Sequence, residues 1–141
     1  MKETIDRVML KMQNHLVDLP QEECWVIYLS PQMTCLGKQC IAKGSLTAVN
    51  IHPRDVFRYA VAYNAYAILV IHNHPSGQYW PSTADRELAR QLVLCGTIMQ
   101  MPLQDFVIIA RMGTYSFFNQ KVLPKMTRKT ILELWTLATN L

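Results

Sequence analysis

Two histidines separated by one residue, His72 and His74, follow an apolar run at residues 67–71, and this arrangement constrains the fold more than any other feature. A short apolar run of this kind is typical of a buried strand. Because side chains alternate along a strand, His72 and His74 are expected to point the same way and Asn73 the other way. Pro75 disfavours the helical region for His74 and keeps it extended. The sequence therefore predicts two imidazoles that face one site.

The next segment predicts a third polar group at the same place. Residues 75–81 are rich in Pro and Gly, which indicates a loop that leaves the strand. Ser82 has the character of a helix N-cap, with the carboxylate of Asp85 three residues later. Apolar residues continue at helical spacing, and Gly96 is the expected end of this helix. A strand end and a helix start would then meet around one pocket.

Two imidazoles and one carboxylate are ligands that zinc accepts, and they leave a fourth tetrahedral position free for water. Bound metal would lower the pKa of that water and polarise a substrate carbonyl. None of the three ligands can take the water's proton while bound, so a further residue, a Glu, is expected elsewhere. Glu22 and Glu23 are the candidates, at the head of a predicted strand over residues 24–29. Only one of two adjacent strand residues can face the pocket, and the pattern alone leaves both open.

These residues and their spacing resemble the JAMM motif of the MPN+ zinc hydrolases. The motif is His72-x-His74, seven residues, Ser82, two residues and Asp85, with a Glu on an upstream strand. Over about residues 20–123 the chain resembles, more narrowly, the RadC-like branch. That resemblance lies in Gly44-Ser45-Leu46, His52-Pro53-Arg54-Asp55-Val56-Phe57, His72-Asn73-His74-Pro75-Ser76-Gly77 and Pro81-Ser82-x-x-Asp85.

The resemblance implies an α/β fold, a three-layer α/β/α sandwich around a mixed sheet of the JAB1/MPN (cytidine-deaminase-like) type. It also implies that the metal ligands are His72, His74 and Asp85, and that the metal is Zn²⁺. The implied activity is that of a metallopeptidase or isopeptidase with an unidentified protein or peptide substrate.

The resemblance further assigns roles to two residues outside the ligand set. In the family register the catalytic Glu lies seven residues before the Leu that closes the first strand. That Leu is Leu29 here, so the register selects Glu22 over Glu23 as the general base. Ser82 would stabilise the oxyanion alongside the metal.

The chain also departs from the family pattern. RadC-like proteins often begin with a helix-hairpin-helix region, and residues 1–19 have neither the length nor the Gly-rich turns for one. Where the family usually has Asp-His, this chain has Asp105-Phe106, so any supporting role of that imidazole is lost. Residues 124–141 match no part of the family pattern.

Periodicity predicts helices that alternate with strands, which suggests a mixed sheet with helices on its faces. We expect a catalytic domain over residues 1–123, with residues 1–18 as a helical lead-in, and a basic amphipathic helix over residues 124–141. The expected helices are residues 2–15, 53–63 and the segment from Ser82 onward. The expected strands are residues 24–29, 34–42, 45–49, 67–72 and 106–110, followed by a turn at Gly113 and an extended segment at 115–118.

Composition fits one domain in the cytoplasm. Half of the residues are hydrophobic, but no apolar run approaches the roughly 20 residues of a membrane span. Residues 1–19 mix charges throughout, so we expect no signal peptide. The four cysteines form no Cys-x-x-Cys pair and are expected to be reduced.

The formal net charge of +4 raises a second hypothesis, a RadC-like protein associated with DNA repair that binds or cleaves nucleic acid. Residues 121–141 hold four Lys or Arg against one Glu, so they carry +3 and leave +1 for the rest. A short cluster of this kind favours a solvated helix end over a phosphate-binding surface. A third hypothesis is a partner-binding module built on the stripe Ile131, Leu134, Trp135 and Ala138, although such a stripe is expected to pack on its own domain.

Four other residues have plainer interpretations. His52 precedes Pro53 and is expected to cap a helix or lie on the surface, and His15 is expected to be solvated. Tyr79 and Trp80, in the loop after the histidines, could grip a substrate or pack as a lid on the core, and the sequence does not decide between these roles.

Overall fold

The computed structural model describes residues 2–44 and 51–139 of the chain. One mixed sheet has five strands in the order β2-β1-β3-β4-β5. β3 and β4 are parallel, and the other neighbouring strands are antiparallel. The elements in chain order are α1 (Ile5–Leu16), β1 (Glu23–Leu29), β2 (Cys35–Lys43), α2 (Pro53–Ala62), β3 (Ala67–Asn73), α3 (Thr83–Met99), β4 (Leu103–Ala110), β5 (Gly113–Ser116) and α4 (Arg128–Thr139).

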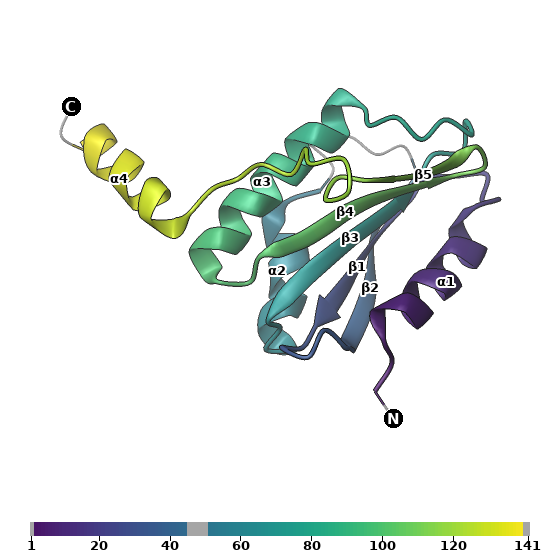
Figure 1. Cartoon of the computed structure of the whole chain (residues 1–141), viewed down its shortest axis with the longest axis horizontal. Coiled ribbons are helices and arrows are strands. Elements are labelled where there is room, and N and C mark those ends of the chain that lie inside the picture. Colours follow the sequence, from purple (N-terminus) through teal and green to yellow (C-terminus); the bar gives the residue numbers. More distant parts are fainter. Residues whose placement is uncertain (1, 45–50, 140–141) are drawn as a thin grey trace.

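The sheet is covered on both faces. α1 lies against one face, while α2 and α3 cover the other (Figure 1). α3 makes the crossover between the parallel strands β3 and β4, as parallel pairing requires a long connection. The expected α/β sandwich around a mixed sheet is therefore confirmed.

Residue parity in the central strands determines which face each side chain joins. In β1, Val26 and Tyr28 pack with α2 and α3, whereas Ile27 and Leu29 pack with α1. β1 and β3 are buried on both faces, which explains why both read as continuous apolar runs. The Tyr28 hydroxyl donates to the Val56 carbonyl oxygen at 2.7 Å and ties the sheet to α2.

The expected end of the third helix at Gly96 is wrong. α3 continues to Met99 and is closed by Gln100, which has the left-handed φ of 58°. Gly96 serves a different purpose, because a Cβ at that position would lie 2.6 Å from the Met101 carbonyl oxygen. The glycine thus allows close approach of the returning chain. It does not end the helix.

Smaller differences occur at other boundaries. The first helix begins at Ile5, three residues later than expected, and the Thr4 hydroxyl accepts a hydrogen bond from the Arg7 N–H as its N-cap. The last strand is Gly113–Ser116, so it lies two residues earlier than the expected segment at 115–118. The strand expected at 45–49 falls outside the described residues.

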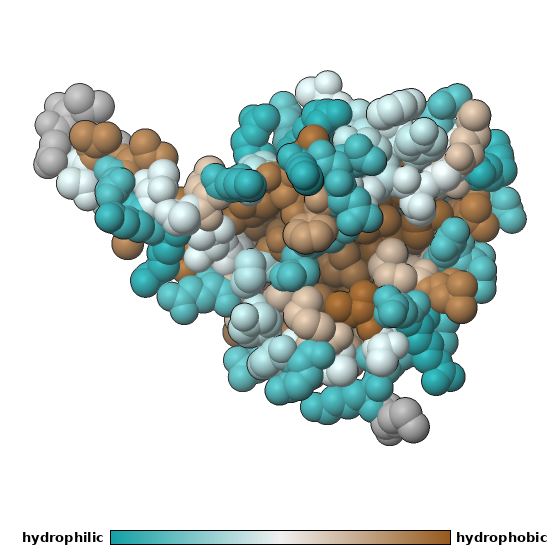
Figure 2. Space-filling view, in the orientation of Figure 1, coloured by the Kyte–Doolittle hydropathy of each residue, from teal (hydrophilic) through white to brown (hydrophobic). Residues whose placement is uncertain are grey.

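The C-terminal helix corrects a further expectation. α4 begins at Arg128 and projects from the body of the molecule (Figure 1). Leu134 and Trp135 are 56% and 69% exposed, and only Ile131 of the described stripe is half-buried. Apolar side chains are accordingly visible on the projecting helix (Figure 2). The expectation that this stripe packs on its own domain is therefore wrong. Within the described residues, none of the helices has both the length and the apolar character that a membrane span needs.

Candidate metal centre

The end of β3 carries the two histidines as the strand alternation predicts. His72 is buried on the face covered by α2 and α3, and the His74 N–H donates to the Ile109 carbonyl oxygen at 3.0 Å, which keeps the chain extended past the strand. The two imidazole rings lie 4.9 Å apart between centroids. Both rings therefore line one site.

Asn73 points to the other side and binds backbone. Its Oδ1 accepts from the Glu23 N–H at 2.7 Å, and its Nδ2 donates to the Gln21 carbonyl oxygen at 2.9 Å. The segment that carries Glu22 is thus fixed on both sides to the end of β3. The sequence predicts that Asn73 points away from the histidines but does not predict this role, because no local pattern shows the pairing of residues fifty positions apart.

The loop after β3 fixes the orientation of His74. The Gly77 N–H donates to the His74 carbonyl oxygen at 3.0 Å, and Gly77 has the positive φ of 90° that this tight turn requires. The His74 Nδ1 lies 2.9 Å from the Gln78 carbonyl oxygen. Since a carbonyl can only accept, Nδ1 carries the proton, so Nε2 is the nitrogen that a cation in the site would bind.

Ser82 and Asp85 form the capping box that the sequence predicts. The Asp85 N–H donates to Ser82 Oγ at 3.1 Å, and the Ser82 N–H donates to Asp85 Oδ2 at 2.7 Å. This box satisfies two backbone donors at the start of α3 and fixes the carboxylate. Asp85 is buried as a result, with its carboxylate against the histidines.

Three side chains converge at this point. His72 Nε2 lies 2.9 Å from Asp85 Oδ1, His74 Nε2 lies 3.1 Å from Asp85 Oδ2, and the two Nε2 atoms are 3.1 Å apart. Tetrahedral zinc with bonds of about 2.0–2.1 Å places its ligand atoms roughly 3.3 Å from one another. Two imidazole nitrogens and a carboxylate at nearly this spacing fit a divalent cation.

The charge state of these groups also suits a cation. Burial opposes ionisation of Asp85, but the hydrogen bonds from His72 and His74 outweigh it and hold the pKa of that carboxyl far below its usual range. Burial lowers the pKa of His74, and its hydrogen bond and charge interaction with Asp85 more than reverse this, so the pKa is raised overall. The site therefore keeps a buried carboxylate that attracts positive charge.

No other His, Cys, Asp or Glu among the described residues joins this cluster. Cys24 lies directly opposite His72 in the pairing of β1 with β3. Burial raises the pKa of the Cys24 thiol, and the nearby Cys40 and Asp85 raise it further. Burial therefore favours the protonated thiol, and Cys24 is not among the three groups that converge here.

The two adjacent glutamates have different surroundings. Glu22 lines a shallow hollow together with Pro75 and Ser76, and its charge contributes to raising the pKa of His74. Glu23 is 4% exposed on the α1 side, where its Oε1 accepts from Trp25 Nε1 at 2.9 Å and lies 3.0 Å from His15 Nε2. Glu22 thus lies by the cluster and Glu23 does not.

The pairing with Glu23 corrects the expectation for His15. Its side chain is 47% exposed, yet its ring contacts both Glu23 and Trp25, so His15 is not simply solvated. His52 is the N-cap residue of α2, as expected, and its backbone N–H donates to Asp55 Oδ2 at 3.1 Å.

The two loop aromatics have different environments. Tyr79 is half-buried, packs on the core beside α2 and α3, and lies under Gly113. The Trp80 ring lies at a tilt against the rings of Tyr79 and Tyr115 but remains 63% exposed. Tyr79 therefore covers the core, whereas most of the Trp80 side chain is exposed to solvent.

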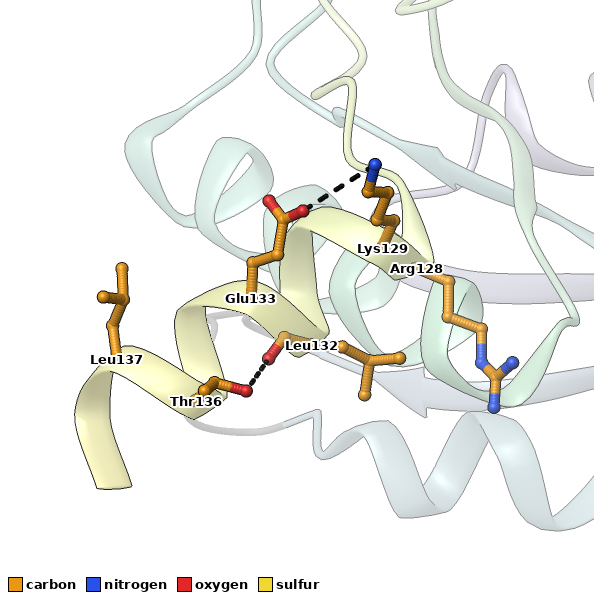
Figure 3. Close-up of a pocket in the computed structure, with 6 residues that line it drawn as sticks. All are labelled: Arg128, Lys129, Leu132, Glu133, Thr136 and Leu137. Atoms are coloured by element: carbon orange, nitrogen blue, oxygen red, sulfur yellow. Dashed lines mark hydrogen bonds and ion pairs between the residues drawn. The ribbon is translucent and has the colours of Figure 1, made fainter. Parts of the chain in front are cut away.

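A separate hollow of about 630 Å³ runs along α4 (Figure 3). Its one carboxylate, Glu133, is paired with Lys129 at 4.0 Å, and its other lining residues are Arg128, Leu132, Thr136 and Leu137. These six lining residues include no metal-ligand cluster and no base beside a nucleophile. We therefore assign no catalytic role to this hollow.

Comparison with known proteins agrees with this geometry. Residues 3–122 match the family described as RadC-like JAB domain. A UPF0758 protein from Chlorobaculum parvum is 34% identical over 112 residues, which cover 79% of this chain and 50% of that protein. A UPF0758 protein from Thermotoga maritima is 39% identical over 107 residues, which cover 76% of this chain and 48% of that protein.

The chain spans about half the length of the curated relatives it matches. Their names give a family and no activity. The matched region contains the three converging groups, Ser82 and both glutamates, so the family resemblance inferred from the motif is confirmed over most of the sequence. The chain belongs to the RadC-like JAB domain family.

Proposed function

We propose that this chain is a zinc-dependent hydrolase of amide bonds in a protein or peptide. The observation that supports this most is the convergence of His72, His74 and Asp85 without a fourth protein ligand among the described residues. Three protein ligands are characteristic of catalytic zinc, whereas structural zinc usually has four. The bound metal would supply a Lewis acid and a water of lowered pKa.

Two imidazoles and a carboxylate would hold the ion. His72 and His74 offer Nε2, and the bond from His74 Nδ1 to the Gln78 carbonyl oxygen fixes the tautomer that this requires. Asp85 offers a carboxylate that the capping box holds in place. These contacts to the backbone of the protein itself fix the ligand groups, and groups fixed in this way need little reorganisation to bind.

Glu22 would act as the general base. It would accept a proton from the attacking water as the water oxygen bonds to the carbonyl carbon. It would then give that proton to the nitrogen as the C–N bond breaks, which releases an amine and a carboxylic acid. The position of Glu22 beside Pro75 and Ser76 supports this role.

Ser82 would stabilise the oxyanion. Its Oγ accepts from the Asp85 N–H, and its own hydroxyl proton remains available to donate to a developing negative charge. The same hydroxyl would therefore both cap α3 and act on the substrate.

The experiment compares Glu22→Gln with Glu23→Gln in the full chain loaded with zinc. Both variants are probed with a mixed pool of synthetic peptides and isopeptides, with the products identified by mass spectrometry and the metal content by elemental analysis. We expect Glu22→Gln to retain about one zinc per chain and to lose about 10²–10⁴-fold in turnover. Glu23→Gln should retain both metal and turnover. Loss of metal together with activity in Glu22→Gln would make Glu22 structural and refute its role as the base.

A further inference from the structure

The two histidines at the centre differ in what supports them. His74 donates from Nδ1 to the Gln78 carbonyl oxygen, as metal-bound histidines generally do. His72 is 2% exposed, and its Nδ1 has no hydrogen-bond partner. Among the side chains of the described residues, this is the one buried nitrogen or oxygen without a partner.

The surroundings of His72 explain why its Nδ1 is unpaired. The Phe106 ring lies edge-on at 5.6 Å from the imidazole, and Phe106 is fully buried. Cys24 and Ile108 are its direct neighbours on β1 and β4. An aromatic ring, an alkyl group and a thiol therefore flank His72, and none of them is a strong hydrogen-bond acceptor.

When a histidine binds metal through one ring nitrogen, a hydrogen-bond acceptor at its other ring nitrogen has a known effect. It fixes the orientation of the imidazole and makes the coordinating nitrogen more basic, and its loss typically weakens metal binding by about 10–100-fold. When Nε2 of His72 is directed at the cation, Nδ1 must carry the proton. That N–H then has no hydrogen-bond acceptor among the described residues.

We infer that Phe106 and Cys24 set the metal affinity of this site, because they flank His72 and leave its Nδ1–H without an acceptor. The metal is accordingly bound more weakly than it would be with two supported histidines. This inference rests on the same three ligands as the proposed function but does not require hydrolysis.

The test measures zinc affinity by competition with a chromophoric chelator, using the full chain. Phe106→His replaces the ring with one that can accept a hydrogen bond, and Cys24→Ser places a hydroxyl acceptor directly opposite His72. Phe106→Leu is the control, since it changes the shape and adds no acceptor. We expect at least one of the two acceptor variants to bind zinc about 10-fold or more tightly than the unmodified chain. Phe106→Leu should show no such gain.

The two acceptor variants protect the interpretation against different errors. Tighter binding in Phe106→His alone could arise if the new imidazole became a fourth ligand, which a serine hydroxyl does far less readily. Thermal unfolding of each apo variant checks that it is folded. If both folded variants match the unmodified chain in zinc affinity, the inference is wrong.

A second readout observes the nitrogen directly. In zinc-loaded protein labelled with ¹⁵N-histidine, the Nδ1–H proton of His74 should show the downfield shift of a hydrogen-bonded proton, and that of His72 should not. A downfield His72 proton in the unmodified chain would overturn the inference. Failure to bind zinc at all would refute this inference and the proposed function together, whereas zinc binding without hydrolysis would refute the proposed function alone.

Discussion

The two faces of the sheet use the same residue types for different purposes. On the face covered by α2 and α3, His72, His74 and Asp85 direct three ligand atoms at one point. On the face covered by α1, the carboxylate of Glu23 is matched by the Trp25 indole N–H and the His15 ring. A carboxylate whose oxygens are taken up by donors stabilises the fold, whereas ligand atoms that converge on a common point can hold a cation.

The adjacent residues Glu22 and Glu23 show the same difference between the two faces. They are adjacent in sequence, yet one lies by the metal cluster and the other is buried beside α1. Their chemistry in water is the same. The difference teaches that the face of the sheet, and the donors on it, determine whether a glutamate can act in catalysis or is confined to structure.

The largest effect is expected from a substitution in the candidate metal site, on the face covered by α2 and α3. Asp85→Asn keeps a side-chain oxygen that can accept from the Ser82 N–H, so the start of α3 should remain capped. It removes the one negative charge from the cluster. We expect the zinc content to fall from about one per chain to near zero in elemental analysis, while the circular dichroism spectrum is unchanged. Zinc retained by the Asp85→Asn variant would contradict the ligand assignment.

A smaller effect is expected at Asn73, which joins the segment that carries both glutamates to the end of β3. Asn73 is 1% exposed and makes hydrogen bonds of 2.7 and 2.9 Å to the backbone of Glu23 and Gln21. Asn73→Ala leaves these buried backbone groups without partners, so we expect a loss of about 2–3 kcal/mol in the free energy of unfolding. Urea denaturation measures it. A loss below about 0.5 kcal/mol would show that Asn73 does not join the two segments.

A still smaller loss of stability is expected when the charge of Glu23 is removed on the face covered by α1. Glu23→Gln keeps the shape of the side chain and weakens its charge-assisted bonds to Trp25 and His15, which we expect to cost about 1–2 kcal/mol at neutral pH. Zinc content is the control, and it should not change. A loss of zinc in this variant would mean that the two faces are not independent.

The same substitution predicts a dependence on pH. Burial raises the pKa of Glu23, but hydrogen bonds from Trp25 and His15 and the charge of Lys43 outweigh it, so the pKa lies below its ordinary value of 4.5. A lowered folded-state pKa contributes stability above the unfolded value, and this contribution is lost as pH falls through the folded value. The stability gap between the unmodified chain and Glu23→Gln should therefore be full above pH 4.5 and shrink below it. A gap that is constant with pH would exclude the carboxylate charge as its cause.

The smallest effect is expected outside both faces. Removal of the chain from Arg128 onward deletes α4, whose Leu134 and Trp135 are mostly exposed. Little apolar surface of the domain is uncovered, so we expect the free energy of unfolding to change by less than about 0.5 kcal/mol. Denaturant unfolding of the shortened chain measures this. A larger loss would mean that α4 packs on the domain after all.

Local patterns predicted much of the fold and of the candidate site. The alternation around Asn73 predicted that His72 and His74 share a face, and the Ser82–Asp85 spacing predicted the capping box. Each of these features depends on residues only a few positions apart. The end of α3 was missed because Gly96 is set by contact with Met101 after the chain turns, and a left-handed Gln100 ends the helix.

The sequence by itself determined the ligand types, their spacing and the strand and helix that carry them, because alternation and capping act within a few residues. Only the tertiary structure decided which side of the sheet Glu22 and Glu23 occupy, that Asn73 ties their segment to β3, and that Phe106 lies against His72. Those facts depend on how distant strands pair. Pairing is set by the burial of both faces of the sheet at once, and no single segment of the chain contains that information.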